Sequence, residues 1–213
     1  MTDKTKKFYN RIYRNSKKSV FENPEEELLR LLRRKEAKTL KRGLDLGSGD
    51  GRNALFLAKK GYDVDCIDNS IEGLRKIRNQ IKNRKLKGKL HLIDANLKNI
   101  VLEKENYNLI ICVRTFHEIG KKATQNIIKQ MKNSTGAKGI NYLSFFIHRK
   151  GTYMKKNCYY PNESEILKQY TGWKIIRKIK CLETHSHPLP ESCTKRIKHD
   201  HYICHLILKE IER

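Results

Sequence analysis

The sequence predicts an α/β fold: a mostly parallel seven-stranded sheet with helices on both faces, closed by an antiparallel C-terminal hairpin. Two observations support this prediction. Apolar strand-like runs alternate with helical patterns from residue 43 to residue 147, and two final strand-like runs follow with no helical pattern between them. A chain of 213 residues is long enough to bury the core that such a sheet needs.

The N-terminal part of the chain predicts two helices. Tyr9 and Tyr13 are spaced four residues apart, which would place both rings on one face of a short helix. The stretch that begins Asn23-Pro24 is typical of a helix start, with Asn23 as the N-cap and Glu26 at the third position. The leucines that follow form an apolar helical stripe to about residue 35.

The central part predicts five strands with helices between them. The strands are expected at Gly43–Leu46, Asp63–Ile67, Lys89–Ile93, Tyr107–Val113 and Gly139–Ile147. The helices are expected at Arg52–Lys60, Ile71–Arg84 and Lys121–Asn133. This alternation is typical of parallel strands joined by helical crossovers.

The pattern changes near the C-terminus. After a short helix at Glu163–Tyr170, the runs Trp173–Cys181 and His201–Leu208 are expected to pair antiparallel. We therefore treat residues 1–213 as one domain. It would comprise a helical cap at 1–38, a ligand-binding core at 39–150, and a substrate-side helix and hairpin at 151–213.

The chain is strongly basic, with 47 Lys and Arg against 23 Asp and Glu and a formal net charge of +24. Such a charge favours anionic partners, among them nucleic acid. Basic runs at 30–42 and 75–89 would suit phosphate contacts, although many solvated helices look the same. The abundance of Lys, Ile and Asn is also typical of an AT-rich genome, so nucleic-acid binding and simple compositional bias both remain open.

The sequence predicts a cytoplasmic protein that does not cross a membrane. No apolar run approaches the roughly 20 residues of a membrane span, and the start MTDKTKKFYN lacks the apolar part of a secretory signal. The six cysteines include no CxxC pair and are expected to be reduced thiols.

Residues 44–70, LDLGSGDGRNALFLAKKGYDVDCIDNS, predict a ligand site. A strand ends at Leu46, Gly47-Ser48-Gly49-Asp50-Gly51 forms a turn, and Arg52 opens a helix. Glycines permit positive φ and let a ligand approach the backbone, and a helix N-terminus offers free N–H groups to an anion. The carboxyl ends of parallel strands are also where α/β folds bind ligands.

The spacing of this turn narrows the ligand. In the dinucleotide pattern GxGxxG the third glycine would stand at Arg52, so NAD and FAD are disfavoured, and no GxxxxGKS/T loop is present. Asp68 follows Gly47 by 21 residues and would end the next strand. A carboxylate there can accept hydrogen bonds from two ribose hydroxyls. The turn and Asp68 together predict a nucleoside-containing cofactor.

The stretch Asp45–Gly51 fits the pattern E/D-x-G-x-G-x-G in full and resembles motif I of class I S-adenosylmethionine-dependent methyltransferases. Its continuation, RNALFLA followed by GYDV, resembles the tellurite-resistance (TehB-like) branch, with Ser48 where that branch usually has cysteine. The resemblance runs from about Tyr9 to the C-terminus and is strongest over 43–70. It implies a Rossmann-like, doubly wound fold, S-adenosyl-L-methionine as cofactor, and methyl transfer.

The resemblance also implies roles for individual residues. Asp45 and the turn would meet the methionine part of the cofactor, Asp68 the ribose, and Asp94 the adenine amino group. Tyr13 would belong either to a lid over the cofactor or to a plain docking helix. The cofactor-binding residues implied are Asp45, Gly47, Ser48, Gly49, Arg52, Asn53, Asp68, Asn69, Asp94, Ala95, Arg114 and Tyr13.

The segment after the fourth strand bears on the methyl acceptor. Arg114-Thr115-Phe116-His117 lacks the D/N/S-P-P-Y/F/W motif of enzymes that methylate adenine or glutamine amino groups, and the chain has no Pro-Cys dipeptide of the cytosine-C5 type. We therefore expect a small acceptor that is anionic or soft, such as a chalcogen oxyanion or a thiol. An RNA or ribosome methyltransferase, and a non-catalytic cofactor- or metal-binding module, remain alternatives.

The C-terminal hairpin carries two HxH pairs, one at His185 and His187 and one at His199 and His201. On strands, each pair would place both imidazoles on one face. These four histidines, with Cys193 near them, have ligand types that zinc accepts, but the spacing matches no standard finger and no bound metal is expected. In the resembled family a His and Arg residues of this hairpin lie at the substrate site. The catalytic candidates are His185, Arg196, His117 and Arg114.

Overall fold

The computed structural model describes residues 3–17, 19–21, 23–82, 84–189 and 195–211. Its strands are β1 (Arg42–Leu46), β2 (Asp63–Asp68), β3 (Leu90–Asp94), β4 (Tyr107–Val113), β5 (Thr135–Phe146), β6 (Lys174–Pro188) and β7 (Arg196–Lys209). The helices are α1 (Asp3–Asn15), α2 (Glu26–Leu32), α3 (Arg52–Lys59), α4 (Ile71–Lys82), α5 (Phe116–Ile119), α6 (Lys121–Ser134) and α7 (Glu163–Gln169), with a 3₁₀ turn at Lys35–Ala37.

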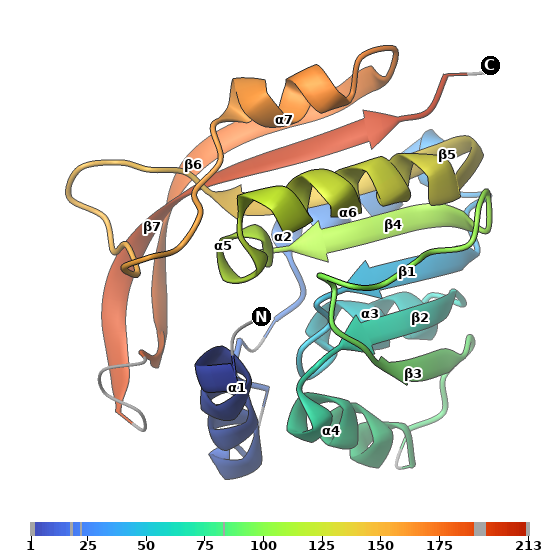
Figure 1. Ribbon diagram of the computed structural model, residues 1–213. Helices are drawn as coiled ribbons and strands as arrows, with labels where there is room; N and C mark the ends of the chain where they lie inside the picture. The colour runs from blue at the N-terminus through green and yellow to red at the C-terminus, as the bar shows by residue number, and fades with distance from the viewer. Residues whose placement is uncertain (1–2, 18, 22, 83, 190–194, 212–213) are drawn as a thin grey trace.

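The strands form one seven-stranded sheet in the order β3-β2-β1-β4-β5-β7-β6 (Figure 1). Strands β1 to β5 pair in parallel, and β7 pairs antiparallel with both β5 and β6. The prediction of a mostly parallel sheet with an antiparallel C-terminal hairpin is therefore confirmed. Both hairpin strands extend further than expected, because polar and charged residues continue the ladder beyond the apolar runs.

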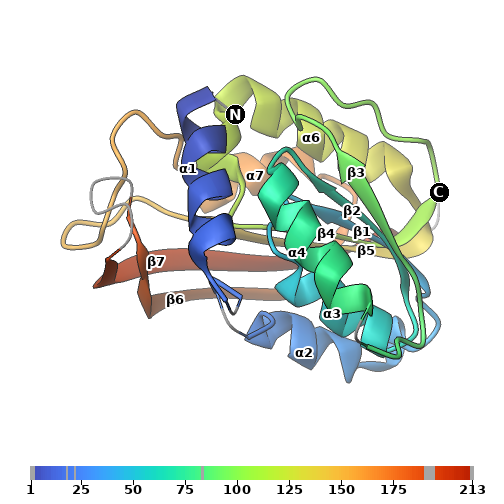
Figure 2. The ribbon, with the colours of Figure 1, turned by 90° about the horizontal axis from the view of Figure 1, so that it is seen from below.

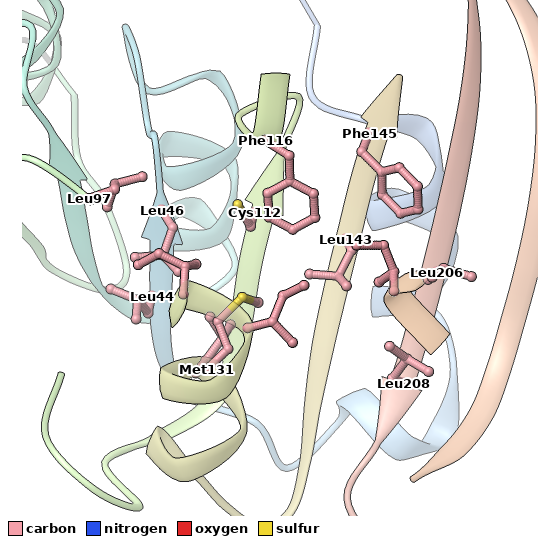
Figure 3. Close-up of a cluster of buried hydrophobic side chains, with 14 of the residues drawn as sticks. Leu44, Leu46, Leu97, Cys112, Phe116, Met131, Leu143, Phe145, Leu206 and Leu208 are labelled. Atoms are coloured by element: carbon pink, nitrogen blue, oxygen red, sulfur yellow. The ribbon is translucent and has the colours of Figure 1, made fainter. Parts of the chain in front are cut away.

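Two apolar cores cover the two faces of the sheet, and β4 contributes to both. Ile110 and Cys112 belong to the core under α6 and α7, whereas Leu109 and Ile111 belong to the core under α2, α3 and α4. Alternation along a strand sends neighbouring side chains to opposite faces, so a central strand buried on both sides is apolar throughout. Figure 2 shows α6 on one face and α2 and α3 on the other, and Figure 3 shows the first core around Phe116.

The start of α2 differs from the prediction. The helix begins at Glu26 with Glu25 in the N-cap position, so the assignment of Asn23 as N-cap is wrong. Tertiary contacts hold the preceding residues extended. The backbone N–H of Glu25 donates to the Asn53 side chain at 3.0 Å, and the carbonyl oxygen of Asn23 accepts from the Arg52 guanidinium at 3.0 Å. Contacts with α3 therefore override the local capping signal.

The far end of the hairpin runs past the rest of the sheet. The last residue of β5 that pairs with β7 is Phe146, which lies opposite Ile203. Residues 182–188 of β6 and 196–202 of β7 pair with each other beyond that point, and we call this segment the hairpin end. Figure 1 shows it extending beyond the end of β5. It carries both HxH pairs.

None of the helices in the described part of the chain combines the length and the apolar character that crossing a membrane requires.

Candidate functional site

The turn after β1 is tied to the end of β2 through its own backbone. The N–H groups of Gly47 and Ser48 donate to the carbonyl oxygen of Ile67 at 2.8 and 3.1 Å, and the N–H of Gly49 donates to the carboxylate of Asp68 at 2.8 Å. These three amides are engaged within the chain, whereas the sequence led us to expect N–H groups free for a ligand. The turn thus fixes the two strand ends relative to each other.

Glycine is required at two positions of this turn by its surroundings. Gly47 and Gly49 have φ values of 78° and 56°, in the left-handed region that favours glycine. A Cβ at Gly47 would lie 2.4 Å from the hydroxyl of Thr115, and one at Gly49 would lie 2.5 Å from the hydroxyl of Tyr13. The turn therefore packs against the end of β4 on one side and against α1 on the other.

The Asp68 carboxylate lies between the turn and the start of α4. One oxygen accepts the Gly49 N–H, and the other accepts the Ser70 N–H at 2.7 Å. Burial raises the pKa of Asp68, while these backbone hydrogen bonds act in the opposite direction. Each carboxylate oxygen can accept a second hydrogen bond. Asp68 thus keeps acceptor capacity toward the cavity that it lines.

Helix α1 covers this cavity with two stacked tyrosines. The rings of Tyr9 and Tyr13 lie 5.9 Å apart, and both side chains line the cavity. The helix docks on the start of α4 through Asn10, whose side-chain oxygen accepts the Ser70 hydroxyl at 2.7 Å, and through an ion pair between Arg14 and Glu72 at 3.1 Å. Figure 2 shows α1 beside α4. These contacts confirm the docking-helix interpretation, and a role of α1 as a lid over the cofactor stays a prediction.

One cavity brings together most of the residues predicted for the site. It lies at the carboxyl ends of β1, β2 and β4, between α1 and the hairpin end. The predicted residues that line it are Tyr13, Gly47, Ser48, Gly49, Arg52, Asn53, Asp68, Asn69, Ala95, Arg114, His117 and His185.

Three predicted residues lie outside this lining. Asp45 is buried within β1. Asp94 is exposed at the end of β3, opposite Asp68 in the ladder. Arg196 lines a second cavity, where its guanidinium donates to the carbonyl oxygen of Val20 at 3.5 Å and to that of Ser186. The structure therefore does not bring Arg196 to the first cavity with His185.

The two cavities share a wall. Its members are Phe21, Arg52, Arg114, His185 and His187, which line both cavities. This wall joins side chains from the N-terminal segment, α3, the end of β4 and the hairpin.

Arg114 is held by a cluster of charged side chains, of which Glu25 is buried and the others are partly buried. Its guanidinium lies 3.0 Å from Glu25 and 2.8 Å from Glu183, and Arg52 also pairs with Glu25. Burial alone would raise the pKa of Glu25, but Arg114 and Arg52 lower it. Arg114 is also 3.2 Å from Nδ1 of His185. A guanidinium only donates, so this nitrogen accepts and the ring proton of His185 is on Nε2.

Glu118 is a site residue that the sequence analysis did not single out. Its carboxylate accepts the Tyr9 hydroxyl at 3.0 Å, contacts Lys155 at 2.9 Å and lies 3.3 Å from Nε2 of His117. Burial alone would raise the pKa of Glu118, but the contacts with His117 and Lys155 lower it to about 2. In the sequence, the position of Glu118 directly after the predicted site residue His117 indicates that it could lie at the site. No motif in the sequence indicates Lys155.

The hairpin end brings its histidines together on one face, as the alternation predicted. His185 lies opposite His199 and Glu183 lies opposite His201 in the ladder. The Nε2 atoms of His187 and His199 are 3.2 Å apart. Burial lowers the pKa of His187 to about 4 and that of His201 to about 2, and neighbouring histidines contribute to both shifts. Cys193, expected near this group, lies outside the described residues.

A comparison with protein-family models identifies the family. A family model described as tellurite resistance protein TehB matches residues 32–188. A protein of Haemophilus influenzae named "Probable S-adenosyl-L-methionine-dependent methyltransferase TehB" is 34% identical over 100 residues, which cover 47% of this chain and 34% of that protein. The match therefore spans about a third of the relative's length.

Solved structures show the same fold. The crystal structure of TehB from Haemophilus influenzae superposes with a TM-score of 0.70 at 22% identity, over 87% of this chain and 62% of that one. The N-methyltransferase NodS from Bradyrhizobium japonicum, in complex with S-adenosyl-L-homocysteine, gives a TM-score of 0.70 at 14% identity, over 99% and 100% of the two chains. These likenesses confirm the Rossmann-like fold predicted from the sequence.

The burial of Asp45 predicts that the stability of the protein depends on pH. It is 2% exposed, and one of its carboxylate oxygens has no hydrogen-bond partner among the described residues. Burial raises the pKa of Asp45 to about 7, with Arg52 opposing this shift. The folded state therefore binds this proton more tightly than the unfolded chain, so the free energy of unfolding falls as pH rises from about 4 to 7 and the loss is complete above that range.

We expect Asp45→Asn to stabilise the protein at pH 8, by up to about 4 kcal/mol, and to have little effect at pH 4. Urea unfolding at both pH values measures the difference between variant and wild type. Asp63→Asn, at an exposed position at the start of β2, serves as the control. An Asp45→Asn effect that is the same at both pH values would contradict the assignment.

Proposed function

Because the chain belongs to the TehB family of tellurite resistance proteins, we propose that it transfers a methyl group from S-adenosyl-L-methionine to a small, soft acceptor such as a thiol or a chalcogen oxyanion. The observation that carries this proposal is that two groups of predicted site residues line the same cavity. A glycine turn and Asp68 line one part of it, and His117 and the hairpin histidines line another. A cofactor site and an acceptor site would thus meet in a single space.

The residues around the turn fit the cofactor. Gly47 and Gly49 let the turn pack closely against Thr115 and Tyr13, and Asp68 has acceptor capacity for ribose hydroxyls. Tyr13 and Tyr9 would cover the bound molecule and exclude water. When bound, the sulfonium supplies a methyl group that a nucleophile can attack in line. The protein's main tasks are then to hold the acceptor at the right distance and to remove its proton.

His117 is the group best placed to take that proton. Its Nε2 faces the Glu118 carboxylate at 3.3 Å, and a carboxylate only accepts, so the ring proton lies on Nε2. Nδ1 then carries a lone pair, and this buried atom has no hydrogen-bond partner among the described residues. Transfer to a thiol would form a C–S bond and break the bond from the methyl carbon to the sulfonium sulfur. That sulfur keeps the electron pair, and Nδ1 of His117 takes the thiol proton.

The charges at this end of the cavity favour a soft acceptor. In the described part of the chain, each Lys or Arg that lines the cavity contacts a carboxylate: Arg52 and Arg114 contact Glu25, and Lys155 contacts Glu118. Aromatic rings and imidazoles also line the cavity. Of the two acceptors proposed, such a lining therefore favours a thiol over a strongly hydrated oxyanion, whose desolvation would meet no uncompensated cation.

Asp68→Ala tests the cofactor site. Loss of hydrogen bonds from a charged acceptor costs about 1.5–3 kcal/mol, so we expect S-adenosylhomocysteine to bind roughly 10- to 100-fold more weakly, as measured by calorimetry. The matched control is Asp63→Ala, because Asp63 is an aspartate at the opposite end of the same strand, away from the cavity. Equal affinity in the Asp68 variant and the wild type would remove Asp68 from the site.

His117→Ala tests the acceptor side. Loss of a general base slows proton removal by about 10²- to 10⁴-fold, so methyl transfer should fall by that factor while S-adenosylhomocysteine affinity stays within about threefold of wild type. His91→Ala is the control, because His91 is exposed on β3 at the far edge of the sheet. A loss of cofactor affinity without a loss of turnover would assign His117 to the other side of the cavity.

The acceptor class is tested by a labelled-methyl assay over a panel of thiols, selenite, tellurite, halides and total RNA. We expect label on thiols or on the chalcogen acceptors, and less in Asp68→Ala at subsaturating cofactor. Label that appears on RNA alone, with a steep dependence on salt, would favour the nucleic-acid alternative.

A further inference from the structure

We propose that His187, His199 and His201 form a binding site for one transition-metal dication of the zinc type, with three imidazole ligands and an open position toward the cavity. One ligand nitrogen from each ring lies within 4.8 Å of the others. His187 and His201 line the cavity.

Hydrogen bonds to the backbone set the tautomers of two rings. Nδ1 of His187 lies 2.9 Å from the carbonyl oxygen of Pro188, and Nδ1 of His199 lies 2.8 Å from that of Ile197. A carbonyl oxygen only accepts, so both Nδ1 atoms carry a proton and both Nε2 atoms of the neutral rings carry a lone pair. Those two Nε2 atoms face each other at 3.2 Å. Two lone pairs at this distance repel unless a cation or a proton lies between them.

The spacing of the first two rings suits a metal ion. Zinc–imidazole bonds are about 2.0–2.1 Å long in tetrahedral sites, which places two ligand nitrogens about 3.3 Å apart. The contact of 3.2 Å between His187 and His199 is close to this value. An Nδ1–H bonded to a backbone carbonyl is also the usual way in which proteins orient a metal-binding histidine.

The third ring is held by packing. His201 is 4% exposed and stacks on Phe146 with ring centroids 4.0 Å apart. Tyr153 packs against His199 at 5.0 Å and against His201 at 5.7 Å. Structural zinc sites use four protein ligands, whereas zinc sites with three protein ligands keep a fourth position open. Aromatic rings around such a site limit the access of solvent to the metal.

A second cluster, Cys181, Glu183 and His205, also has its ligand atoms close together. Its members are already engaged, because Glu183 pairs with Arg114 at 2.8 Å and Nδ1 of His205 lies 2.9 Å from the Tyr142 hydroxyl. The protein therefore uses that cluster for its own charge balance, and the three-histidine group is the better metal candidate.

The open position would bind a soft anionic acceptor, a role that rests on the proposed function. Zinc prefers thiolate sulfur, and coordination releases the thiol proton to solvent or to a base. The metal would then supply the positive charge that the compensated side chains of the cavity lack. The metal site itself does not depend on methyl transfer.

Equilibrium dialysis of the full chain against Zn²⁺ tests the site, with Co²⁺ as a spectroscopic probe of tetrahedral geometry. We expect about one ion per chain. Loss of an outer hydrogen-bond partner already weakens metal binding about 10- to 100-fold, so His187→Ala, His199→Ala and His201→Ala should each weaken it by roughly 100-fold or more. His91→Ala should bind like wild type. His201→Gln repeats the test with a larger side chain in case the alanine variant unfolds.

Three outcomes would overturn the proposal: no stoichiometric binding by the wild type, binding that survives all three alanine substitutions, or an NMR titration that shows one proton shared between His187 and His199 in the presence of Zn²⁺. Calorimetry with S-adenosylhomocysteine on the same proteins separates the two proposals. Intact cofactor binding without metal binding overturns only the metal site, and metal binding without cofactor binding overturns only the proposed function.

Discussion

Three successive amides of the turn after β1 donate to the last two residues of β2. This link closes the gap between neighbouring strand ends and sets where Asp68 faces the cavity. It requires a tight turn, and the close approach of Thr115 and Tyr13 leaves no room for side chains at Gly47 and Gly49. The position of α1 follows from the same link. Tyr13 packs on the turn, and Asn10 accepts a hydrogen bond from the hydroxyl of Ser70, whose backbone N–H donates to Asp68.

The cluster of Glu25, Arg52, Arg114 and Glu183 joins parts of the chain that lie far apart in sequence. Removing Arg114 or Arg52 would leave the buried carboxylate of Glu25 with less compensation, which destabilises the fold. The cluster therefore fixes the N-terminal segment and the hairpin to the end of β4. Arg114 itself has a φ of 54°, rare for a residue with a side chain. The backbone is held there by a hydrogen bond from its N–H to the carbonyl oxygen of Ser144 at 2.6 Å.

Features encoded locally could be predicted from the sequence. Apolar runs and glycines located the strands, the turn and Asp68, because strand periodicity and turn geometry depend on neighbouring residues. Features that arise from distant partners could not be predicted. Glu25 replaces Asn23 as N-cap because it meets arginines of two other elements, and Lys155 reaches Glu118 from a loop without a motif. The engagement of the turn amides likewise depends on how closely β2 lies to β1.

The hairpin end stands outside the two apolar cores, and its ladder partners are its own two strands. Apart from Glu183, which pairs with Arg114, and His201, which is buried against Phe146, substitutions there alter the wall of the cavity without touching either apolar core. The stretch that matches the turn pattern, in contrast, is locked by steric contact on both sides. A change of acceptor would therefore need fewer compensating substitutions in this projecting ribbon than in the turn.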